Sequence, residues 1–223
     1  MNQDSWISSY QKKRALWLHD GNVKQPHALL TSGKHSDGFF NSELVMEDSN
    51  LLGSAALDLF NSLILNKLEV DTVFRVVGPA MGAITLAHDL SHCFSHGRKS
   101  NLYPCLCAYT EKEGEGENLR MVFKRTVIQK GEHILLCEDV LTTGGSVEMT
   151  MKAVEEAGGI ILPFVALLIN RSGLSEVKGK KIVALINKPM SMWKADECPL
   201  CKQGSEAIRP KGKENWARLN ATC

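Results

Sequence analysis

Two adjacent carboxylates followed by a hydroxyl- and glycine-rich loop are the residues of this chain best suited to chemistry. The apolar run Ile134–Cys137 leads into Glu138 and Asp139, and Thr142-Thr143-Gly144-Gly145-Ser146 follows before a helical pattern begins at Val147. Glycines let backbone N–H groups face a single ligand, and the N-terminus of a helix favours a negative one. The pattern therefore predicts a phosphate site at the end of a strand. The carboxylates suit sugar hydroxyls, a metal, or positive charge that develops on carbon.

A nucleotide-binding P-loop and an ordinary polar turn are the competing interpretations of this stretch. The P-loop pattern Gly-x-x-x-x-Gly-Lys-Ser/Thr is missing, and no lysine follows the glycines. An ordinary strand–turn–helix would also place polar residues in its turn. The phosphate site remains the leading interpretation.

A second strand–loop–helix joint is predicted at Val76–Ala83 and contains Gly78-Pro79-Ala80-Met81. Gly-Pro turns are common, so this joint alone is equally consistent with a plain turn. Beside the first loop it gains weight, because two backbone anion sites at neighbouring strand ends indicate a ligand that carries phosphate at both ends.

The elements that must position these loops alternate between strand and helix. The pattern predicts strands over 72–77, 102–109, 121–127, 134–137 and 165–169, and helices over 6–18, 51–68, 83–94 and 147–157. Residues 31–38 predict a tight turn that leads into Phe39 and Phe40, and residues 110–120 a charged, glycine-containing excursion. Pro163 argues against a central strand at its own position. The alternation indicates an α/β fold with a central parallel sheet flanked by helices, in which ligands bind beyond the carboxyl ends of the strands.

The composition excludes several classes of protein. The 223 residues are 43% hydrophobic and carry 26 basic and 25 acidic side chains, which excludes a disordered chain, a collagen-like fibre and a coiled coil. A net charge of +1 gives no argument for nucleic acid or a membrane as partner. The first residues lack a signal-peptide pattern, and the seven cysteines form an odd set. We therefore expect reduced thiols in a cytoplasm.

Four stretches of the sequence resemble a known family. The segment 134–146 resembles the phosphoribosyl-pyrophosphate (PRPP) signature of type I phosphoribosyltransferases. Ser32–Ser36 with Phe39-Phe40-Asn41 resembles the amino-terminal motif of orotate phosphoribosyltransferases, and Ala166–Arg171 resembles the strand that carries their orotate-binding arginine. Cys198–Gly204 is similar to a tail seen in some bacterial members. The resemblance runs from about residue 26 to about residue 210.

The resemblance implies a magnesium-dependent enzyme that transfers ribose 5-phosphate from PRPP to orotate. The products would be orotidine 5'-phosphate and pyrophosphate, in pyrimidine nucleotide synthesis. A type I phosphoribosyltransferase fold would form a single domain over 1–223, with an N-terminal base-binding hood over about 1–45 and the core plus C-terminal tail over about 46–223. Mg²⁺ would be carried by the pyrophosphate, with no direct protein ligand assigned. The family also implies a homodimer.

The implied site residues fall into three groups. PRPP would be bound by Glu138, Asp139, Val140, Leu141, Thr142, Thr143, Gly144, Gly145 and Ser146, and by Gly78, Pro79, Ala80 and Met81. The base would be bound by Ser32, Gly33, Lys34, Phe39, Phe40, Thr142 and Arg171. The catalytic residues would be Glu138, Asp139 and Lys112.

The sequence departs from the family pattern around the expected mobile loop. Glu111 stands where many orotate enzymes have arginine, although Lys112-Glu113 is kept, and Thr31 and Met81-Gly82 stand where a common subgroup has lysines. Lys124 and Arg125 resemble the trailing basic pair of a second bacterial subgroup, or belong to a plain surface loop. A phosphoribosyltransferase for a different nucleobase therefore stays an alternative. A non-catalytic PRPP-sensing regulator is another, although the sequence shows no appended helix-turn-helix.

Two further sets of residues could hold a metal. Histidines spaced four apart share one helix face, but the glutamate of a zinc-protease helix is absent, so a solvated face is expected for His88, His92 and His96. Cys198 and Cys201 form half a zinc knuckle without a following second pair, and a plain turn in the tail is expected. Structural zinc and a redox pair stay open, and other cysteines such as Cys105 and Cys107 could join only through folding.

Overall fold

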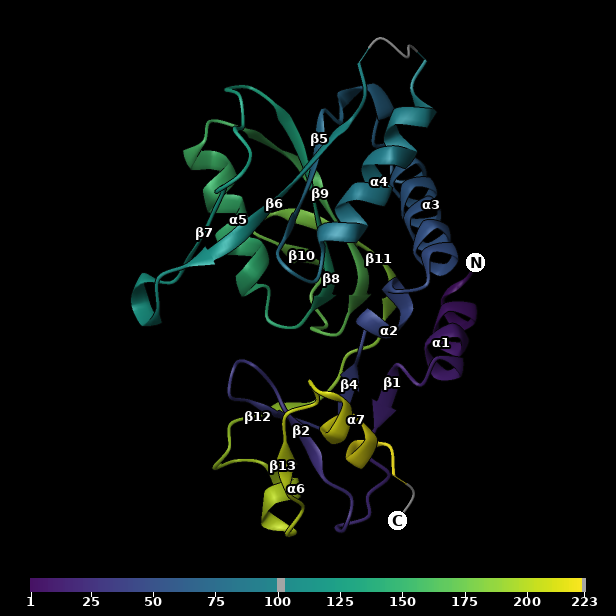
Figure 1. The fold of residues 1–223 in the computed structure, drawn as a ribbon, viewed down its shortest axis with the longest axis vertical. Helices are drawn as coiled ribbons and strands as arrows, with labels where there is room; N and C mark the ends of the chain where they lie inside the picture. Colours follow the sequence, from purple (N-terminus) through teal and green to yellow (C-terminus); the bar gives the residue numbers. More distant parts are fainter. Residues whose placement is uncertain (100–102, 222–223) are drawn as a thin grey trace. The chain divides into compact units, whose positions relative to one another are not determined.

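The chain forms two compact units, shown as a ribbon in Figure 1. The computed structural model describes residues 1–99 and 103–221. Unit 1 comprises residues 1–3 and 46–188, and unit 2 comprises residues 4–45 and the described residues from Pro189 onward. The division lies near the expected boundary at residue 45. The C-terminal tail, however, belongs to unit 2 and not to the core, so the two ends of the chain build unit 2 together.

A mixed seven-stranded sheet forms the centre of unit 1. Its strand order is β10-β11-β9-β8-β5-β6-β7, with β5 (Arg75–Pro79), β6 (Leu106–Glu113), β7 (Arg120–Val122), β8 (His133–Leu141), β9 (Ile160–Asn170), β10 (Glu176–Val177) and β11 (Lys180–Asn187). The five inner strands are parallel, and only the edge strands β10 and β7 pair antiparallel. The expected parallel sheet is therefore confirmed, with an antiparallel strand added at each edge.

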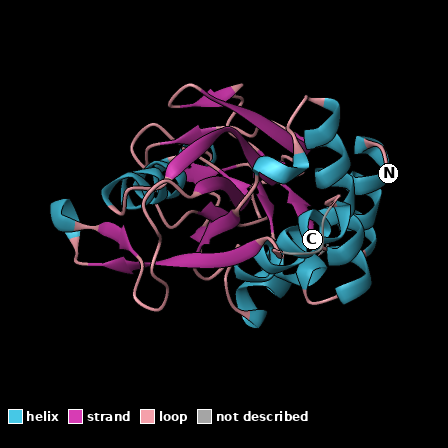
Figure 2. Cartoon of the chain, turned by 90° about the horizontal axis from the view of Figure 1, so that it is seen from above, coloured by secondary structure: helices cyan, strands magenta, loops and turns pink. Residues whose placement is uncertain are grey.

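Helices cover both faces of this sheet (Figure 2). Alternate residues of β8 explain why: Ile134 and Leu136 pack into a cluster with α5 (Gly145–Glu156), whereas Leu135 and Cys137, on the opposite face, are equally buried. Helices α3 (Ser49–Leu65) and α4 (Ile84–Gly97) pack against each other. The helices expected over 51–68, 83–94 and 147–157 are thus confirmed as α3, α4 and α5. No helix of the described chain is long and apolar enough to cross a membrane.

Two strand predictions need correction. Pro163 lies inside β9, which is a central strand. The register between β8 and β9 shifts between Ile134 and Leu136, close to this proline. Because proline has no N–H to donate to a neighbouring strand, such an irregularity is what allows it in a central strand. The strand expected over 102–109 is found as β6, which begins at Leu106, and residue 102 lies outside the described residues.

The excursion expected over 110–120 is a β-hairpin. Strand β6 continues to Glu113 and pairs antiparallel with β7, and η2 (Gly116–Asn118) lies in the connection. Opposite charges face each other across this hairpin: Arg120 Nη2 lies 2.5 Å from Glu113 Oε2, and Arg125 Nε lies 3.2 Å from Glu111 Oε1. Cross-strand pairs of this kind stabilise a hairpin, which the sequence pattern alone did not reveal. The strand expected over 121–127 correspondingly ends at Val122.

Unit 2 contains short strands from both ends of the chain. One sheet has the order β12-β3-β2-β13, with β2 (His27–Leu29), β3 (His35–Ser36), β12 (Met192–Trp193) and β13 (Ala207–Ile208), and a separate ribbon pairs β1 (Leu16–Leu18) with β4 (Gly38–Phe40). Helices α6 (Pro199–Lys202) and α7 (Lys213–Leu219) follow in the tail. Of the turn expected over 31–38, residues 31–34 lie in the β2–β3 connection, in which Gly33 has a φ of 78°. His35 and Ser36 instead form β3, and Gly38 begins β4.

The first predicted helix is shorter than expected. Helix α1 (Gln3–Lys12) ends where Arg14 adopts a φ of 51° and the Ala15 N–H donates to the Tyr10 carbonyl. Trp17, which the helical spacing included, lies in β1 opposite Phe39. Strand pairing has thus overridden helical periodicity over residues 16–18.

Candidate active site

The signature segment forms the strand–loop–helix joint that its residues predict. Strand β8 carries Glu138 and Asp139 near its carboxyl end, and α5 begins four residues after β8 ends. Gly144 is the N-cap residue of α5 and has a φ of 89°, a left-handed conformation that favours glycine. No side chain of the described residues caps this helix, so its first N–H groups are available to an anion.

A small pocket opens at this joint. Its volume is about 50 Å³, and it is lined by Glu138, Val140, Leu141, Thr142, Thr143, Gly144, Gly145, Ser146 and Val147. A single water-sized sphere needs roughly 10–15 Å³, so the pocket has room for a group of several heavy atoms. It can therefore seat one phosphoryl group against the N-terminus of α5.

The acidic pair is divided into a buried and a partly exposed member. Glu138 is 7% exposed, and Asp139 is half-buried. Burial raises the pKa of Glu138 well above its usual value, the neighbouring Asp139 raises it further, and the Lys112 charge opposes them. Glu138 therefore favours its neutral acid form.

This raised pKa predicts that the contribution of Glu138 to the stability of the protein falls as pH rises. The unfolded chain loses the Glu138 proton near pH 4.5 while the folded chain keeps it, so stability is fully present below pH 4.5 and is lost as pH rises through the folded pKa. We expect the difference in unfolding free energy between Glu138→Gln and the wild type to grow by about 1.4 kcal/mol per pH unit in that window. Urea unfolding at several pH values measures it, and parallel curves for the two proteins would contradict the assignment.

The second joint lies beside the acidic pair. Strand β5 pairs with β8, and the Ala80 N–H donates to the Thr110 carbonyl at 2.7 Å. A Cβ added at Gly78 would lie 2.7 Å from the Ala83 Cβ, so only glycine allows this close approach at the end of β5. Met81 is 83% exposed, and the Ala80–Met81 peptide bond is cis. The structure thus brings the two predicted anion-binding loops to neighbouring strand ends.

Gly82 lies against Asp139, although in the sequence it stands out only as a departure from a common subgroup of the family. A Cβ at this position would lie 2.7 Å from Asp139 Oδ1 and 2.9 Å from Oδ2, so glycine leaves the space that the carboxylate occupies. In the sequence, only its place immediately after the Gly78–Met81 turn indicates that Gly82 could lie near the ligand. No sequence pattern pairs it with Asp139.

Gly82→Ala is expected to lower kcat/KM by about 10–100-fold, because the new methyl group must displace the Asp139 carboxylate. Gly53→Ala is the matched control: Gly53 lies within α3, and a Cβ there meets nothing within 4 Å. The control should keep kcat/KM and gain about 0.5–1 kcal/mol of stability from helix propensity. Steady-state kinetics and urea unfolding measure both effects, and equal kinetics for the two variants would refute this role of Gly82.

Three predicted basic residues lie on or after the hairpin. Lys112 is exposed on β6 opposite Met121, and its charge acts on Glu138. Lys124 is exposed, and Arg125 forms its ion pair with Glu111. Of these residues, Lys112 has an electrostatic link to the acidic pair.

Arg171 lies directly after β9 and is only 1% exposed. Its backbone N–H donates to the Leu141 carbonyl at 3.1 Å, which places it beside the end of the signature strand. A buried guanidinium at the carboxyl edge of a parallel sheet is suited to pair with an anionic group of a ligand.

The remaining predicted base-binding residues belong to unit 2. Ser32 and Gly33 are exposed in the β2–β3 turn, and Lys34 is half-buried. Phe39 is half-buried and packs edge-on against Trp216, with ring centroids 5.8 Å apart. Phe40 is 2% exposed and packs against Tyr10, so within this unit it is a core residue.

The metal candidates behave differently from one another. The three histidines of α4 are exposed, and the His88 ring lies beside Asp89. Cys198 and Cys201 lie beside His27 and His35, and among residues 1–99 and 103–221 these four form the only cluster of potential metal ligands. The sequence predicts only a plain turn at Cys198 and Cys201, because His27 and His35 lie more than 160 positions away in the chain. Cys105 and Cys107 are not members of this cluster.

Comparisons with known proteins agree with this geometry. Residues 52–199 match the family model described as the phosphoribosyl transferase domain. An orotate phosphoribosyltransferase of Caldicellulosiruptor bescii is 32% identical and covers 96% of this chain and 100% of its own, and one of Campylobacter fetus is 33% identical and covers 85% and 92%. The crystal structure of orotate phosphoribosyltransferase from Aeropyrum pernix has a similar fold, with a TM-score of 0.58 at 22% identity over 80% of this chain and 91% of that one. This chain belongs to the phosphoribosyltransferase family and, within it, to the orotate phosphoribosyltransferases.

Proposed function

We propose that this enzyme transfers ribose 5-phosphate from PRPP to a ring nitrogen of orotate, with release of pyrophosphate. The observation that carries the proposal is the uncapped N-terminus of α5, placed directly after the Glu138–Asp139 pair and beside the Gly78–Met81 turn. This arrangement offers two anion-binding loops on either side of one carboxylate pair, as a ligand with phosphate at both ends requires.

The chemistry needs control of charge more than a covalent nucleophile. The bond between the anomeric carbon and the pyrophosphate oxygen breaks, its electron pair leaves with pyrophosphate, and the base nitrogen forms the new bond to carbon. Positive charge develops on the sugar in between. The acidic pair would stabilise that charge electrostatically and would hold the ribose hydroxyls. Residues 142–146 would hold the 5-phosphate, and residues 78–81 the pyrophosphate.

Magnesium fits the residues at this edge of the sheet. Mg²⁺ takes oxygen ligands, keeps several waters and is commonly bound together with substrate phosphates. We propose that it arrives on the pyrophosphate, whose oxygens supply its ligands, and that the half-buried Asp139 carboxylate complements its charge. When bound, the ion would act as a Lewis acid that neutralises the charge of the leaving group.

Base-binding residues are proposed for each unit separately. In unit 1, we propose that Arg171 pairs with the orotate carboxylate and that Thr142 borders the base. In unit 2, we propose the Ser32–Lys34 turn and Phe39 as base-binding residues. The burial of Phe40 supports a packing role for that ring in place of direct contact. Lys112 would approach the pyrophosphate from the hairpin.

The test is an assay of the purified protein with PRPP, Mg²⁺ and orotate. Consumption of the orotate absorbance with release of pyrophosphate is the expected result. Turnover with another purine or pyrimidine and none with orotate would favour the alternative base, which the departures at Glu111 and Met81 motivate. PRPP binding without pyrophosphate release for any base would favour the PRPP-sensing regulator. We also propose that the protein is a cytoplasmic homodimer. Light scattering of the purified protein measures its mass in solution and so tests the number of subunits.

A further inference from the structure

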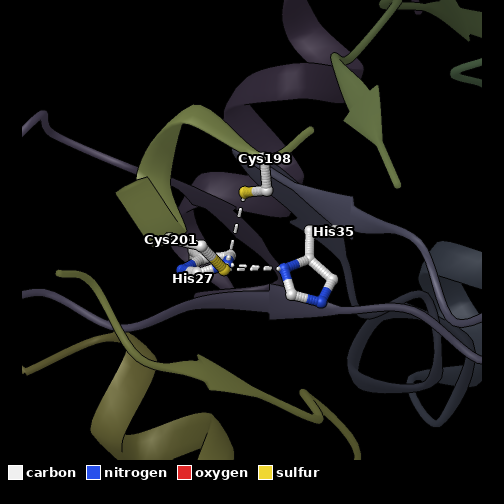
Figure 3. A group of neighbouring side chains, drawn as sticks. All are labelled: His27, His35, Cys198 and Cys201. Atoms are coloured by element: carbon white, nitrogen blue, oxygen red, sulfur yellow. Dashed lines mark hydrogen bonds between the residues drawn. The ribbon is translucent and has the colours of Figure 1, made fainter. Parts of the chain in front are cut away.

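Two histidines and two cysteines converge inside unit 2 (Figure 3). His27 lies on β2 and His35 on β3, whereas Cys198 is the N-cap residue of α6 and Cys201 lies within it. One potential ligand atom from each residue lies within 4.8 Å of all the others. Four such atoms from two distant parts of the chain are the number that a structural zinc site uses.

The distances match the edges of a tetrahedron around zinc. With Zn–S bonds of about 2.3 Å and Zn–N bonds of about 2.0–2.1 Å, the S···N edges are about 3.5–3.6 Å and the N···N edge about 3.3 Å. In the structure, His27 Nε2 lies 3.6 Å from Cys198 Sγ and 3.5 Å from Cys201 Sγ. His35 Nδ1 lies 3.2 Å from Cys201 Sγ and 2.9 Å from His27 Nε2, which is a few tenths of an ångström tighter.

Hydrogen bonding alone does not account for this convergence. The Ser205 hydroxyl donates to the Gln25 carbonyl at 2.7 Å, so its oxygen accepts from His27 Nδ1–H at 2.9 Å. That bond fixes the proton of the neutral imidazole on Nδ1 and leaves a single lone pair on Nε2. Three heavy atoms, His35 Nδ1 and the two sulfurs, face this lone pair, although it can accept only one hydrogen bond well. A cation at the centre would be faced by lone pairs of all four residues.

The same contacts provide the support that a metal-binding histidine normally has. In known metal sites the second ring nitrogen of a ligating histidine donates to a nearby acceptor, which orients the ring. The Ser205 hydroxyl and the Gln25 carbonyl supply that support to His27. His27, His35 and Cys198 are buried, and Cys201 is half-buried, so the cluster is closed on most sides.

We propose that His27, His35, Cys198 and Cys201 form a structural Zn²⁺ site. Two thiolates and two imidazoles are a ligand set that selects zinc, and four protein ligands leave no open position for a substrate. The site is distinct from the acidic pair and from the Mg²⁺ of the proposed reaction, and it does not depend on the identity of the base.

The site would tie the two ends of the chain together within unit 2. His27 and Cys198 are 171 positions apart, and the strands that this unit contains are only two or three residues long. The unit buries apolar side chains such as Trp6, Tyr10 and Phe40, and metal ligation is a further means by which units of this size are stabilised. His35 directly follows Lys34, so a bound ion would also hold in place the β2–β3 turn that carries Ser32, Gly33 and Lys34.

The first test measures metal on the untagged wild-type protein, purified without chelators and dialysed against buffered Zn²⁺. Elemental analysis should find about one zinc per chain. Replacement of the zinc by Co²⁺ should produce a thiolate-to-cobalt charge-transfer absorption. Both readouts use the wild type, so they do not depend on whether a variant folds. Less than about 0.1 zinc per chain, or a Cys198–Cys201 disulfide in the metal-free protein as isolated, would overturn the proposal.

The second test compares matched cysteine variants. Cys198→Ser with Cys201→Ser should retain less than about 0.1 zinc per chain, whereas Cys107→Ser, which removes an exposed thiol of unit 1, should retain about one. A chelator should lower the Tm of the wild type and of Cys107→Ser, and added Zn²⁺ should restore it. Zinc retained by the double variant, or lost equally from Cys107→Ser, would contradict the assignment of these four ligands.

Discussion

The double replacement Glu138→Gln with Asp139→Asn is expected to lower kcat by about 10³-fold or more, while the dissociation constant for PRPP changes by less than about tenfold. Charge on the sugar develops during reaction, so a carboxylate that faces it contributes more to the transition state than to the bound substrate. The amides keep the size of the side chains but replace one oxygen of each carboxyl group with an NH2 donor. Pre-steady-state turnover and equilibrium binding of PRPP measure the two effects separately.

The single variants divide this effect between the two acids. Because burial favours the neutral form of Glu138, Glu138→Gln removes little charge, whereas Asp139→Asn replaces the more exposed carboxyl group of the pair. We therefore expect Asp139→Asn to account for most of the loss in kcat. An equal loss in kcat and in PRPP affinity for the double variant would mean that the pair acts only in ground-state binding.

The second large effect concerns stability and arises at the opposite ends of the same strands. Arg75 at the start of β5 makes two hydrogen bonds to Glu132, which directly precedes β8: Nε to Oε2 at 2.8 Å and Nη2 to Oε1 at 3.1 Å. Their side chains are 7% and 4% exposed. Glu132→Ala would leave the buried guanidinium without this partner, and we expect a loss of about 3–5 kcal/mol in unfolding free energy. Urea unfolding at pH 7 measures this loss.

Two comparisons make that prediction specific. The apolar double variant Arg75→Met with Glu132→Leu removes both charges and should lose much less stability than Glu132→Ala. Burial alone would raise the pKa of Glu132, but the hydrogen bonds from Arg75 and from the Gln129 N–H outweigh it and lower that pKa. The contribution of the pair is therefore present above pH 4.5 and is lost as pH falls through the folded pKa. A Glu132→Ala variant as stable as the wild type at pH 7 would show that the pair contributes nothing.

Glu132 and Glu138 thus illustrate opposite outcomes of burial within one strand region. Glu132 faces a guanidinium and is held ionised, whereas Glu138 faces another acid and favours its neutral form. The first arrangement stabilises the fold, and the second sacrifices stability at neutral pH to place carboxyl groups at the active site. Activity and stability should therefore respond in opposite directions to Glu138→Gln.

The sequence by itself determined the parts of this protein that depend on residues close together in the chain. The strand, acidic pair, glycine loop and helix over 134–157 form one continuous stretch, and each residue type has a local reason for its place. The helices α3, α4 and α5 were predicted for the same reason. Apolar residues that recur every three to four positions over more than about ten residues share one face only in a helix. The family resemblance rests on these same local motifs.

Only the tertiary structure decided the features that depend on distant residues. Pairing with β4 turned residues 16–18 into β1, and pairing of β6 with β7 turned the expected loop over 110–120 into a hairpin. Gly82 meets Asp139, and His27 and His35 meet Cys198 and Cys201, because folding brings together positions that no local pattern relates. Periodicity and spacing indicate which secondary structure a segment prefers. Contacts between distant segments depend instead on the fold of the whole chain.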